Sequence, residues 1–532
     1  MTSEATLRAQ IGQLIVVRAS GHLCDRQIRY PAWEAPEAQL RPWLGDLNLG
    51  GVILLGGSPA ELALRTRQLQ GWAQTPLLIA ADIEEGVGHR FPGATWFPPP
   101  LALRALGDRA AARTYARIMG ATTAREALAL GINWVLAPVV DVNNNPENPV
   151  INVRAFGETP PEVCELAIAF LQGCQDYPVL TTAKHFPGHG DTATDSHLEL
   201  PTLPHTADRL AAVELAPFRA AIAAGVDTVM TAHLLVPAWD AQHPATLSSA
   251  LLTGLLRDRL GFSGLIVTDA LIMGGLASSG PPAELCVQAL AAGADVLLMP
   301  PDPAAAIAAI LAAVQSGRLA AARIQAAWER VQAAKAKLAE PPAPTLTPAT
   351  LELFSATDGD AAARAILRGS QQQGGRLPLA RAATDPPGIN LIVVSSGLNH
   401  PGLAGPASPA IAIPRRYGLE PQLWEQSQLL SWKSSPGQVL LQIFMRGDPF
   451  RGQAGLNIAA QTMFKSLLKQ GQLVAIAIYG SPYVQAWFRQ HSPPELPWVF
   501  TYGQMPDAQQ IALETLWGSP TAASDGVDRV FI

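Results

Sequence analysis

The sequence is poor in the residues that mark several large classes of protein. It has only four cysteines among 532 residues, none in a CxxC pair, which argues against a disulfide framework. We expect all four to be reduced core residues: Cys24, Cys164, Cys174 and Cys286. Charged residues make up 15% of the chain, the formal net charge is −6, and no block of lysine and arginine forms a basic stripe. These values argue against a disordered polyelectrolyte and against nucleic acid as a partner.

Long apolar runs are also missing. No stretch reaches the length needed to span a bilayer, so we expect no membrane segment. The N-terminal segment MTSEATLRAQIGQLIVV has an acid at Glu4 and only a short apolar run. It lacks the basic region, apolar region and small-residue cleavage site of a signal peptide. The sequence therefore predicts a soluble, cytoplasmic protein.

What is present is a regular alternation of strand-like and helix-like segments up to about residue 340. The expected strands are Gly12–Arg18, Gly51–Leu55, Leu77–Ala81, Trp134–Val140, Leu180–Ala183, Thr228–Ala232, Leu265–Thr268 and Val296–Met299. The expected helices between them include Arg109–Leu130, Pro161–Gln175, Pro204–Ala224 and Pro281–Ala292. Alternation of this kind favours a parallel sheet, and eight units of it fit an α/β fold of the (β/α)₈ barrel type.

A second domain follows, because 532 residues exceed what one core usually serves. A closing helix is expected over 325–338, and the proline-rich segment Glu340–Thr350 cannot continue it. We therefore predict a catalytic barrel over residues 1–340, a linker over 341–350, and a smaller α/β domain over 351–532. Its expected elements are the strands Ile389–Val394, Gln438–Phe444, Leu473–Tyr479 and Trp498–Thr501 and the helices Ala459–Lys469 and Ala508–Leu516. Few ionisable groups cluster there, so we expect it to support the barrel.

Polar side chains gather where the barrel strands are expected to end. The residues at these positions are Asp82, Glu84, Asp141, Lys184, His185, His233 and Asp269. In (β/α)₈ barrels the reacting groups lie just after the carboxyl ends of the strands. This bias toward acids, histidine and lysine predicts an active site at that face.

The segment KHFPGHGDTATDSH, residues 184–197, is dense in such side chains and rich in glycine and proline. In an extended segment Asp195 and His197 point the same way, so the carboxylate can orient the imidazole and stabilise its charged form. Such a pair can donate and accept a proton near neutral pH. Opposite it, Asp269 follows a short buried strand, in the place of a nucleophile on a rigid mount.

Each of these residues also has a simpler interpretation. Asp269 could cap a helix, and His197 could be a solvated loop residue. His185 and His189 have HxxxH spacing, but the intervening Pro187–Gly188 prevents an ordinary helix, so metal binding is weakly supported. The combination of these side chains at the strand ends favours catalysis over the simpler interpretations, and we expect no metal or other cofactor.

The loop 184–197 closely resembles the signature of glycoside hydrolase family 3, in particular its β-N-acetylglucosaminidase branch, which uses a His–Asp dyad. Four further blocks agree in order: 137–157, 229–248, 261–276 and 292–300. More weakly, YGSPYVQAWF (479–488) and the TYG of 501–503 resemble the family's C-terminal domain.

The resemblance implies a role for each matching residue. Asp269 would form the glycosyl-enzyme intermediate, and His197, held by Asp195, would protonate the leaving sugar and then activate water. The residues expected to bind the sugar hydroxyls are Asp82, Arg154, Lys184 and His185. The loop would let His197 move in after the sugar binds. One departure is the third-strand loop, which reads Asp-Ile-Glu-Glu-Gly-Val at 82–87 where the family usually has Glu-Gly-Gly-Arg after an acid. This departure concerns contacts with the leaving group.

The leading prediction is a retaining exo-β-N-acetylglucosaminidase that acts on a small saccharide, most simply in the recycling of cell-wall muropeptides. Near alternatives are a β-glucosidase, a β-xylosidase, or a phosphorylase in which phosphate replaces water. More distant ones are a metal-dependent amidohydrolase using His185, His189 and an Asp, and a sugar-binding protein without catalysis.

Overall fold

The computed structural model describes residues 3–338, 354, 357–381, 385–395, 402–403, 405–432, 437–447, 449 and 452–518. The chain divides into two compact units, one of Met1–Ala363 with Pro449–Gly452 and the other of Arg364–Asp448 with Gln453–Ile532. The predicted linker Glu340–Thr350 lies outside the described residues. The predicted domain limits therefore stay a prediction.

The first unit contains an eight-stranded parallel sheet with the order β7-β6-β5-β4-β3-β2-β1-β8. A parallel bridge between Val267 and Val296 joins the two ends of this order, so the strands form a closed barrel. The strands are β1 Ile15–Ser20, β2 Gly51–Leu55, β3 Leu78–Ala81, β4 Trp134–Val135, β5 Leu180–Phe186, β6 Thr228–Thr231, β7 Leu265–Val267 and β8 Leu297–Leu298. This arrangement confirms the predicted barrel and its eight strands.

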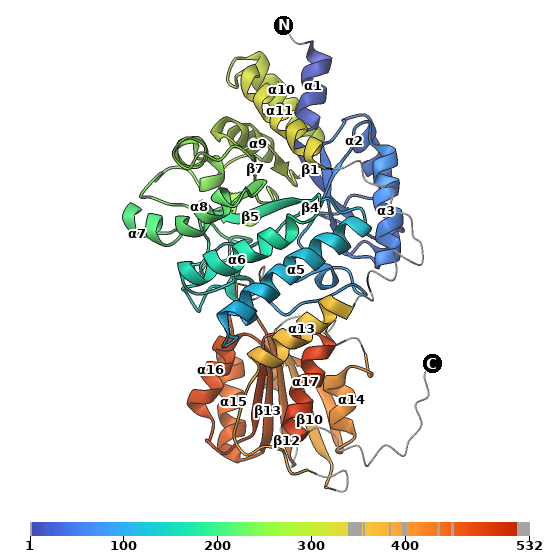
Figure 1. Ribbon diagram of the computed structural model, residues 1–532, viewed down its shortest axis with the longest axis vertical. Helices are drawn as coiled ribbons and strands as arrows, with labels where there is room; N and C mark the ends of the chain where they lie inside the picture. The colour runs from blue at the N-terminus through green and yellow to red at the C-terminus, as the bar shows by residue number, and fades with distance from the viewer. Residues whose placement is uncertain are drawn as a thin grey trace. The chain divides into compact units, whose positions relative to one another are not determined.

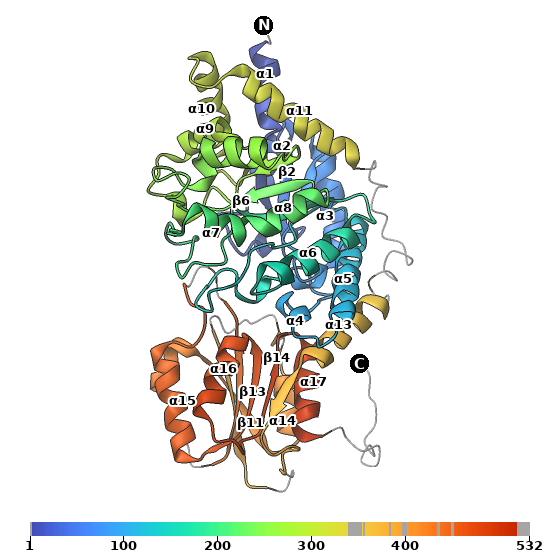
Figure 2. The ribbon, with the colours of Figure 1, turned by 60° about the vertical axis from the view of Figure 1, so that its left-hand side comes forward.

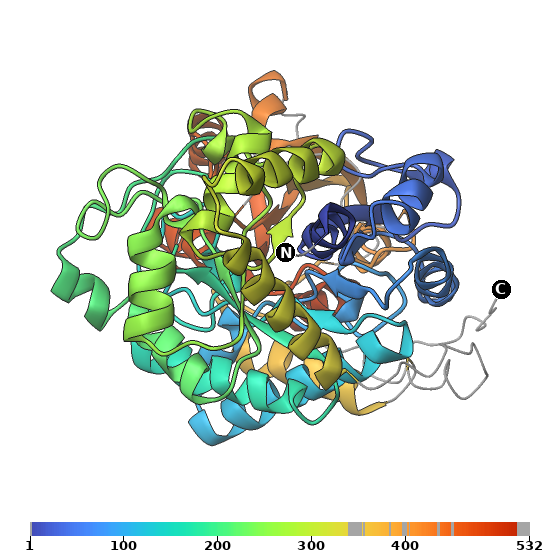
Figure 3. The same ribbon diagram turned by 90° about the horizontal axis from the view of Figure 1, so that it is seen from above.

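Helices surround the barrel strands (Figures 1 and 3). They are α1 Glu4–Gly12, α2 Glu37–Gly45, α3 Pro59–Trp72, α4 Leu101–Arg104, α5 Arg109–Ala129, α6 Pro160–Cys174, α7 Ala207–Ala212, α8 Leu215–Ala223, α9 Pro282–Ala292, α10 Pro303–Gln315 and α11 Ala321–Lys337, with a π-helical turn over Ala250–Arg259. Local sequence explains where several of them begin. Ser58 and Glu61 form a reciprocal capping box at α3, and the Asp302 carboxylate accepts hydrogen bonds from the first turn of α10.

Several of the predicted barrel elements have different limits in the structure, among them β5, which continues from the predicted end at Ala183 to Phe186. The predicted helix Pro204–Ala224 is two helices, α7 and α8, because Pro217 has no N–H for the carbonyl of Val213 and its ring excludes that carbonyl. The fourth strand ends at Val135 rather than Val140, since Pro138 cannot donate to the ladder. Gly12 closes α1 instead of starting β1.

The second unit is a six-stranded sheet with the order β11-β10-β12-β13-β14-β9, parallel except for β9. Its strands are β9 Gln372–Gly374, β10 Gly388–Val394, β11 Leu419–Glu425, β12 Val439–Met445, β13 Leu473–Gly480 and β14 Trp498–Thr501. Its helices are α13 Thr357–Ser370, which begins in the first unit, α14 Pro409–Arg415, α15 Ile458–Gln470, α16 Pro482–His491 and α17 Pro506–Trp517.

Helices cover both faces of this second sheet: α15 and α16 lie on one side, and α14 and α17 lie on the other (Figures 1 and 2). The α/β class predicted for this region is confirmed. The sequence did not predict β9, which is polar, or β11, which is half exposed and contains Pro421. Both strands lie at the edges of the sheet, where side chains are less buried and the sequence therefore lacks the apolar pattern of a central strand.

The cysteine prediction holds for two of the four side chains. All four thiols are free, and Cys174 and Cys286 are buried, but Cys164 is half-buried and Cys24 is exposed. Cys24 lies in the loop after β1, beside the short 3₁₀ turn at Asp25–Gln27, and not in a core element. Among the described residues, no helix is both long and apolar enough to cross a membrane.

Candidate active site

The predicted strand-end side chains converge at the carboxyl ends of the barrel strands. Asp82 directly follows β3, Lys184 and His185 lie in β5, and Asp269 comes two residues after the end of β7. Because all eight strands are parallel, these ends meet at one face of the barrel.

Two carboxylates and two cations form a buried network at this face. Glu84 accepts two hydrogen bonds of 2.7 Å from the guanidinium of Arg154, in a bidentate pair. The Lys184 ammonium lies 2.6 Å from Glu84 Oε1 and donates to Asp82 Oδ1 at 2.8 Å. Glu84 and Lys184 are almost completely buried, while Asp82 is 36% exposed. Asp82 is therefore the member of the network best placed to meet a ligand.

The charges of this network hold each other in the ionised state. Burial raises the pKa of Glu84, but Arg154 and Lys184 outweigh it and hold the pKa well below its usual value. Burial lowers the pKa of Lys184, and Asp82 and Glu84 more than restore it. Two positive and two negative charges give a pre-organised set of donors and acceptors without net charge.

His185 is fixed by a second buried carboxylate. Its Nδ1 lies 2.8 Å from Asp141 Oδ2, and its backbone N–H donates to the same carboxylate. Asp141 Oδ1 also accepts the backbone N–H of His189 at 2.7 Å. Asp141 is fully buried, so the imidazole of His185 has little freedom to turn.

The His189 ring is bonded to hydroxyl groups and not directed at a metal position. Its Nδ1 lies 3.0 Å from Thr192 Oγ1 and its Nε2 lies 2.8 Å from Ser196 Oγ. Burial lowers the pKa of His189 to about 4, so the ring is neutral at physiological pH. Within the described part of the chain, no group of three or more His, Cys, Asp or Glu side chains is placed to hold a metal ion.

The dyad predicted from spacing is formed. His197 Nδ1 donates to Asp195 Oδ1 at 2.8 Å, and the backbone N–H of His197 donates to the same oxygen at 2.9 Å. Asp195 Oδ2 accepts the backbone N–H of Gly452 at 3.2 Å, from a segment that belongs to the barrel unit although it lies far along the chain. Burial raises the pKa of Asp195, but the hydrogen bonds from His197 outweigh it and hold the pKa below its usual value. Asp195 thus stays a carboxylate that can support a charged imidazole.

The dyad loop is bonded to the loop that carries Asp269. The backbone N–H groups of Gly274 and Gly275 donate to the carbonyls of His197 and Ser196, at 3.0 and 3.1 Å. A Cβ at either glycine would lie within 2.7 Å of these carbonyl oxygens, so only glycine allows this approach. Backbone hydrogen bonds therefore join the two loops that carry the proton donor and the nucleophile predicted from the sequence.

Three imidazoles surround Asp269. Burial raises the pKa of this carboxyl, but the fields of His185, His233 and His197 outweigh it and lower the pKa below its usual value. His233 Nε2 donates to the carbonyl of Ala270 at 3.1 Å, which fixes the backbone beside the carboxylate. Asp269 is therefore ionised and rigidly mounted, as a nucleophile requires. No hydrogen bond in the described structure makes it a helix cap; its Oδ1 accepts only the adjacent N–H of Ala270.

An aromatic pair lies on the loop after β1. The rings of Tyr30 and Trp33 are stacked with centroids 5.7 Å apart, and the Arg18 guanidinium lies 5.3 and 5.5 Å from their centroids. Arg18 is paired with Glu34 at 3.5 Å and also interacts electrostatically with Asp82. The aromatic pair therefore packs on a cation that is within electrostatic range of Asp82.

Sequence reasoning missed several of these partners. The sequence analysis predicts Glu84 and Asp141 only as acids at strand ends. The signal that could have indicated more is the two-residue spacing of Asp82 and Glu84, which directs both side chains to the same side of an extended segment. The roles of Gly452 and of Arg18 with its aromatic neighbours left no local signal. Their contacts join segments that are distant in the sequence.

Comparison with known proteins places most of the chain in one family. The model of the glycosyl hydrolase family 3 N-terminal domain matches residues 6–334, and that of the bacterial glycosyl hydrolase family 3 C-terminal domain matches residues 382–518. The chain belongs to glycoside hydrolase family 3. The resemblance predicted from loop 184–197 is thus confirmed.

Individual family 3 relatives carry related names. A β-N-acetylglucosaminidase/β-glucosidase of Cellulomonas fimi is 35% identical over 302 residues, 55% of this chain, and the chain spans about half of that relative's length, 53%. A β-hexosaminidase of Thiobacillus denitrificans is 36% identical over 295 residues, 54% of this chain and 78% of that protein. The solved structure of a family 3 β-N-acetylglucosaminidase from a Paenibacillus species matches with a TM-score of 0.76 and 31% identity, over 96% of this chain and 97% of that one.

Proposed function

We propose that this family 3 protein is a retaining exo-β-N-acetylglucosaminidase that removes terminal β-linked N-acetylglucosamine from a saccharide. The observation that carries the proposal is the His197–Asp195 dyad on a loop bonded to the loop of Asp269. A nucleophilic carboxylate and a separate proton donor are the two groups that a retaining glycosidase needs. The relatives named above support the N-acetyl sugar as substrate.

In the first step, the Asp269 carboxylate attacks the anomeric carbon of the sugar while the glycosidic bond breaks. The ring N–H of His197, on the nitrogen opposite the one bonded to Asp195, donates its proton to the leaving oxygen. Before this step the Asp195 carboxylate stabilises the positively charged imidazole of His197, and the ring becomes neutral as it gives up its proton. The product is a glycosyl ester of Asp269 and a free alcohol.

In the second step, His197 takes a proton from a water molecule that attacks the anomeric carbon and releases Asp269. Asp82, Lys184, Arg154 and His185 would meanwhile hold the sugar hydroxyls. Their ion pairs fix these groups before the sugar arrives, so little ordering is required during the reaction. Movement of His197 into place after the sugar binds stays a prediction of this proposal.

The test is hydrolysis of the nitrophenyl β-glycosides of N-acetylglucosamine, glucose and xylose by the full chain. The proposal expects strong preference for the N-acetyl sugar, retained β configuration in the first-formed product, and no effect of a chelator. Preference for glucose or xylose would contradict the proposed substrate but would be compatible with the proposed retaining mechanism. Loss of activity with chelator would favour the amidohydrolase alternative, and saccharide binding without any turnover would favour a binding protein.

Two finer points need separate arms of the same assay. Added inorganic phosphate would yield a sugar 1-phosphate if phosphate replaces water in the second step. A disaccharide of N-acetylglucosamine and N-acetylmuramic acid would test the cell-wall recycling role. Cleavage of this disaccharide at a rate far below that of chitobiose would argue against that role.

A further inference from the structure

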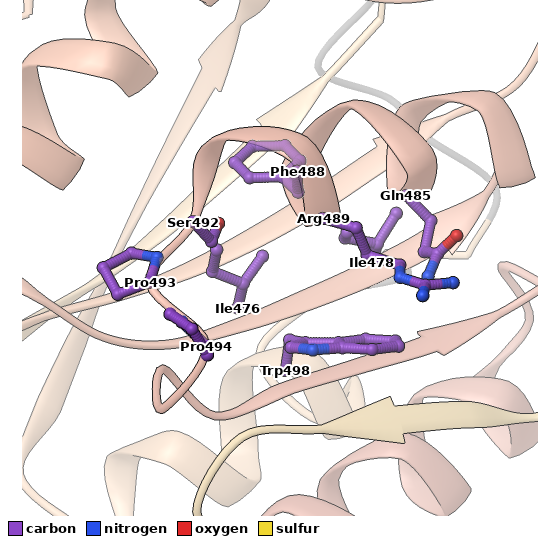
Figure 4. Close-up of a pocket in the computed structure, with 9 residues that line it drawn as sticks. All are labelled: Ile476, Ile478, Gln485, Phe488, Arg489, Ser492, Pro493, Pro494 and Trp498. Atoms are coloured by element: carbon purple, nitrogen blue, oxygen red, sulfur yellow. The ribbon is translucent and has the colours of Figure 1, made fainter.

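A small cavity lies in the second unit, between α16 and the strand end at Trp498 (Figure 4). Its volume is about 220 Å³, which is roughly the volume that seven molecules occupy in liquid water. The side chains of Ile476, Ile478 and Phe488 make its apolar wall. This α16–β14 cavity uses no residue of the proposed active site.

Two of the residues that line the cavity carry a buried polar atom with no hydrogen-bond partner among the described residues. The two atoms are the amide nitrogen of Gln485, which is only 5% exposed, and the hydroxyl of Ser492. A buried polar atom without a partner costs about 1–3 kcal/mol, so native proteins rarely leave one. The cavity therefore presents polar atoms that a ligand could satisfy.

Other buried glutamines of the same unit differ from Gln485. The amide nitrogen of Gln442 donates to Asn390 Oδ1 at 2.7 Å and to the carbonyl of Ala410 at 2.6 Å. The amide nitrogen of Gln509 donates to the carbonyl of Gln504 at 2.9 Å. Of these three buried glutamines, Gln485 at the cavity is the one whose amide nitrogen has no partner.

The indole of Trp498 forms a pre-set flat wall. In the antiparallel pair of β14 and β9, Trp498 lies opposite Gly374, and a Cβ at Gly374 would lie 2.5 Å from the indole nitrogen. Glycine at that position lets the ring lie flat against β9. A ring so placed needs no reordering before a flat molecule stacks on it.

The polar groups occupy two ends of the cavity. Gln485 and Arg489 are four residues apart on α16 and reach toward the same side of the indole, while Ser492 lies at the other end beside Pro493 (Figure 4). No acidic side chain lines the cavity. A guanidinium and an amide donor at one end match a carboxylate, and a hydroxyl at the other end matches a hydroxyl.

We infer that the α16–β14 cavity binds a small carboxylate on a six-membered ring that also bears a hydroxyl group. The carboxylate lies between the Arg489 guanidinium and the Gln485 amide, the ring stacks on Trp498, and Ser492 bonds the hydroxyl. Aromatic acids and sugar acids share this chemistry. The site is separate from the proposed glycosidase reaction and does not depend on it.

The experiment is calorimetric titration of the full chain with 4-hydroxybenzoate and with glucuronate, beside their neutral counterparts 4-hydroxybenzamide and glucose. For ligands of this size we expect a Kd of about 1 mM for one or both acids and at least about tenfold weaker binding of the neutral molecules. The acid that binds more tightly shows whether the ligand is an aromatic acid or a sugar acid. No binding of either acid up to about 20 mM, or equal binding of the neutral molecules, overturns the inference.

Two variants locate the binding. Arg489→Gln and Gln485→Leu should each weaken acid binding by about tenfold or more, while Lys465→Gln, which removes a cation outside the cavity, should leave it unchanged. Gln485→Leu should not lower the melting temperature, because it removes an unsatisfied buried amide. Unchanged binding in both variants, or a fall of several degrees in Gln485→Leu, would mean that these groups serve another purpose.

Discussion

Two of the histidine–aspartate pairs in the barrel unit share a distance of 2.8 Å between Nδ1 and the carboxylate oxygen. The His185–Asp141 pair is nearly completely buried, and His185 lies in β5. The His197–Asp195 pair lies on a loop, and His197 is 16% exposed. In the proposed reaction this shared distance would serve two purposes: the imidazole of His185 would be immobilised beside the sugar, and that of His197 would meet the leaving group and water.

The difference lies in what each carboxylate does besides bonding its histidine. Asp141 accepts backbone N–H groups of His185 and His189 and so shapes the start of the loop. Asp195 is bonded by the backbone N–H groups of His197 and Gly452. A proton donor needs solvent and substrate access, and a positioning group needs the opposite. The two histidine–aspartate pairs therefore differ more in how deeply they are buried than in how their members are bonded.

The largest expected effect comes from removing the carboxylate of Asp269, whose pKa is lowered by the histidines of both pairs. Asp269→Ala should lower kcat/KM by roughly 10⁴-fold or more, since the proposed reaction passes through a covalent intermediate on this carboxylate. The matched control is Asp302→Ala, which removes a true helix cap and should cost about 1 kcal/mol of stability with activity retained. A loss of only several-fold in Asp269→Ala would show that Asp269 is not the nucleophile.

The two histidines themselves should differ in their dependence on the leaving group. His197→Ala should slow cleavage of chitobiose by about 10²–10⁴-fold, but slow the nitrophenyl glycoside much less, because nitrophenol leaves without a proton. His185→Ala should slow both substrates by a similar factor, through weaker sugar binding. Equal damage to both substrates in His197→Ala would remove His197 from the role of proton donor.

Replacing the carboxylates by amides should separate stability from rate. Asp141→Asn should lower the free energy of unfolding by about 2–4 kcal/mol, because it leaves buried donors without a charged acceptor. Asp195→Asn should chiefly lower the rate, since the amide cannot support a positive imidazole. Urea unfolding and kcat on chitobiose measure the two effects, and the reverse pattern would contradict the assignment.

The same pair of variants has a pH dependence with a defined sign. Burial raises the pKa of Asp141, but His185 and the hydrogen bonds it receives hold the folded pKa below the usual value. A depressed pKa contributes stability that is present above the unfolded value, about 3.9, and is lost as pH falls through the folded value. Wild type should therefore lose stability more steeply below about pH 4 than Asp141→Asn. Parallel curves of unfolding free energy against pH would show that Asp141 does not contribute.

The smallest effect concerns the aromatic pair near Asp82. Trp33→Ala should raise KM for chitobiose by about three- to tenfold, the value of one lost stacking contact, and leave the nitrophenyl glycoside of the same sugar nearly unchanged in kcat. Leu64→Ala, at an exposed position on α3, is the control. An unchanged KM for the disaccharide would place the leaving sugar elsewhere.

Local patterns carried most of the prediction. The eight strands were located within a few residues, since each is a short apolar run followed by a polar side chain. The dyad was predicted because its two members are two residues apart and are bonded through the backbone of one turn. Errors arose where a single proline changed the backbone, as at Pro138 and Pro217, and at the polar edge strands β9 and β11.

The amino-acid sequence by itself determined the barrel, the family and the residues offered for catalysis. Only the tertiary structure decided that Glu84 is shared by Arg154 and Lys184, that Gly452 bonds Asp195, and that the Gln485 amide faces a cavity. These contacts join segments separated by tens to hundreds of positions. Periodicity and spacing describe only neighbours along the chain, whereas burial and charge pairing depend on which distant segments the closed sheet brings together.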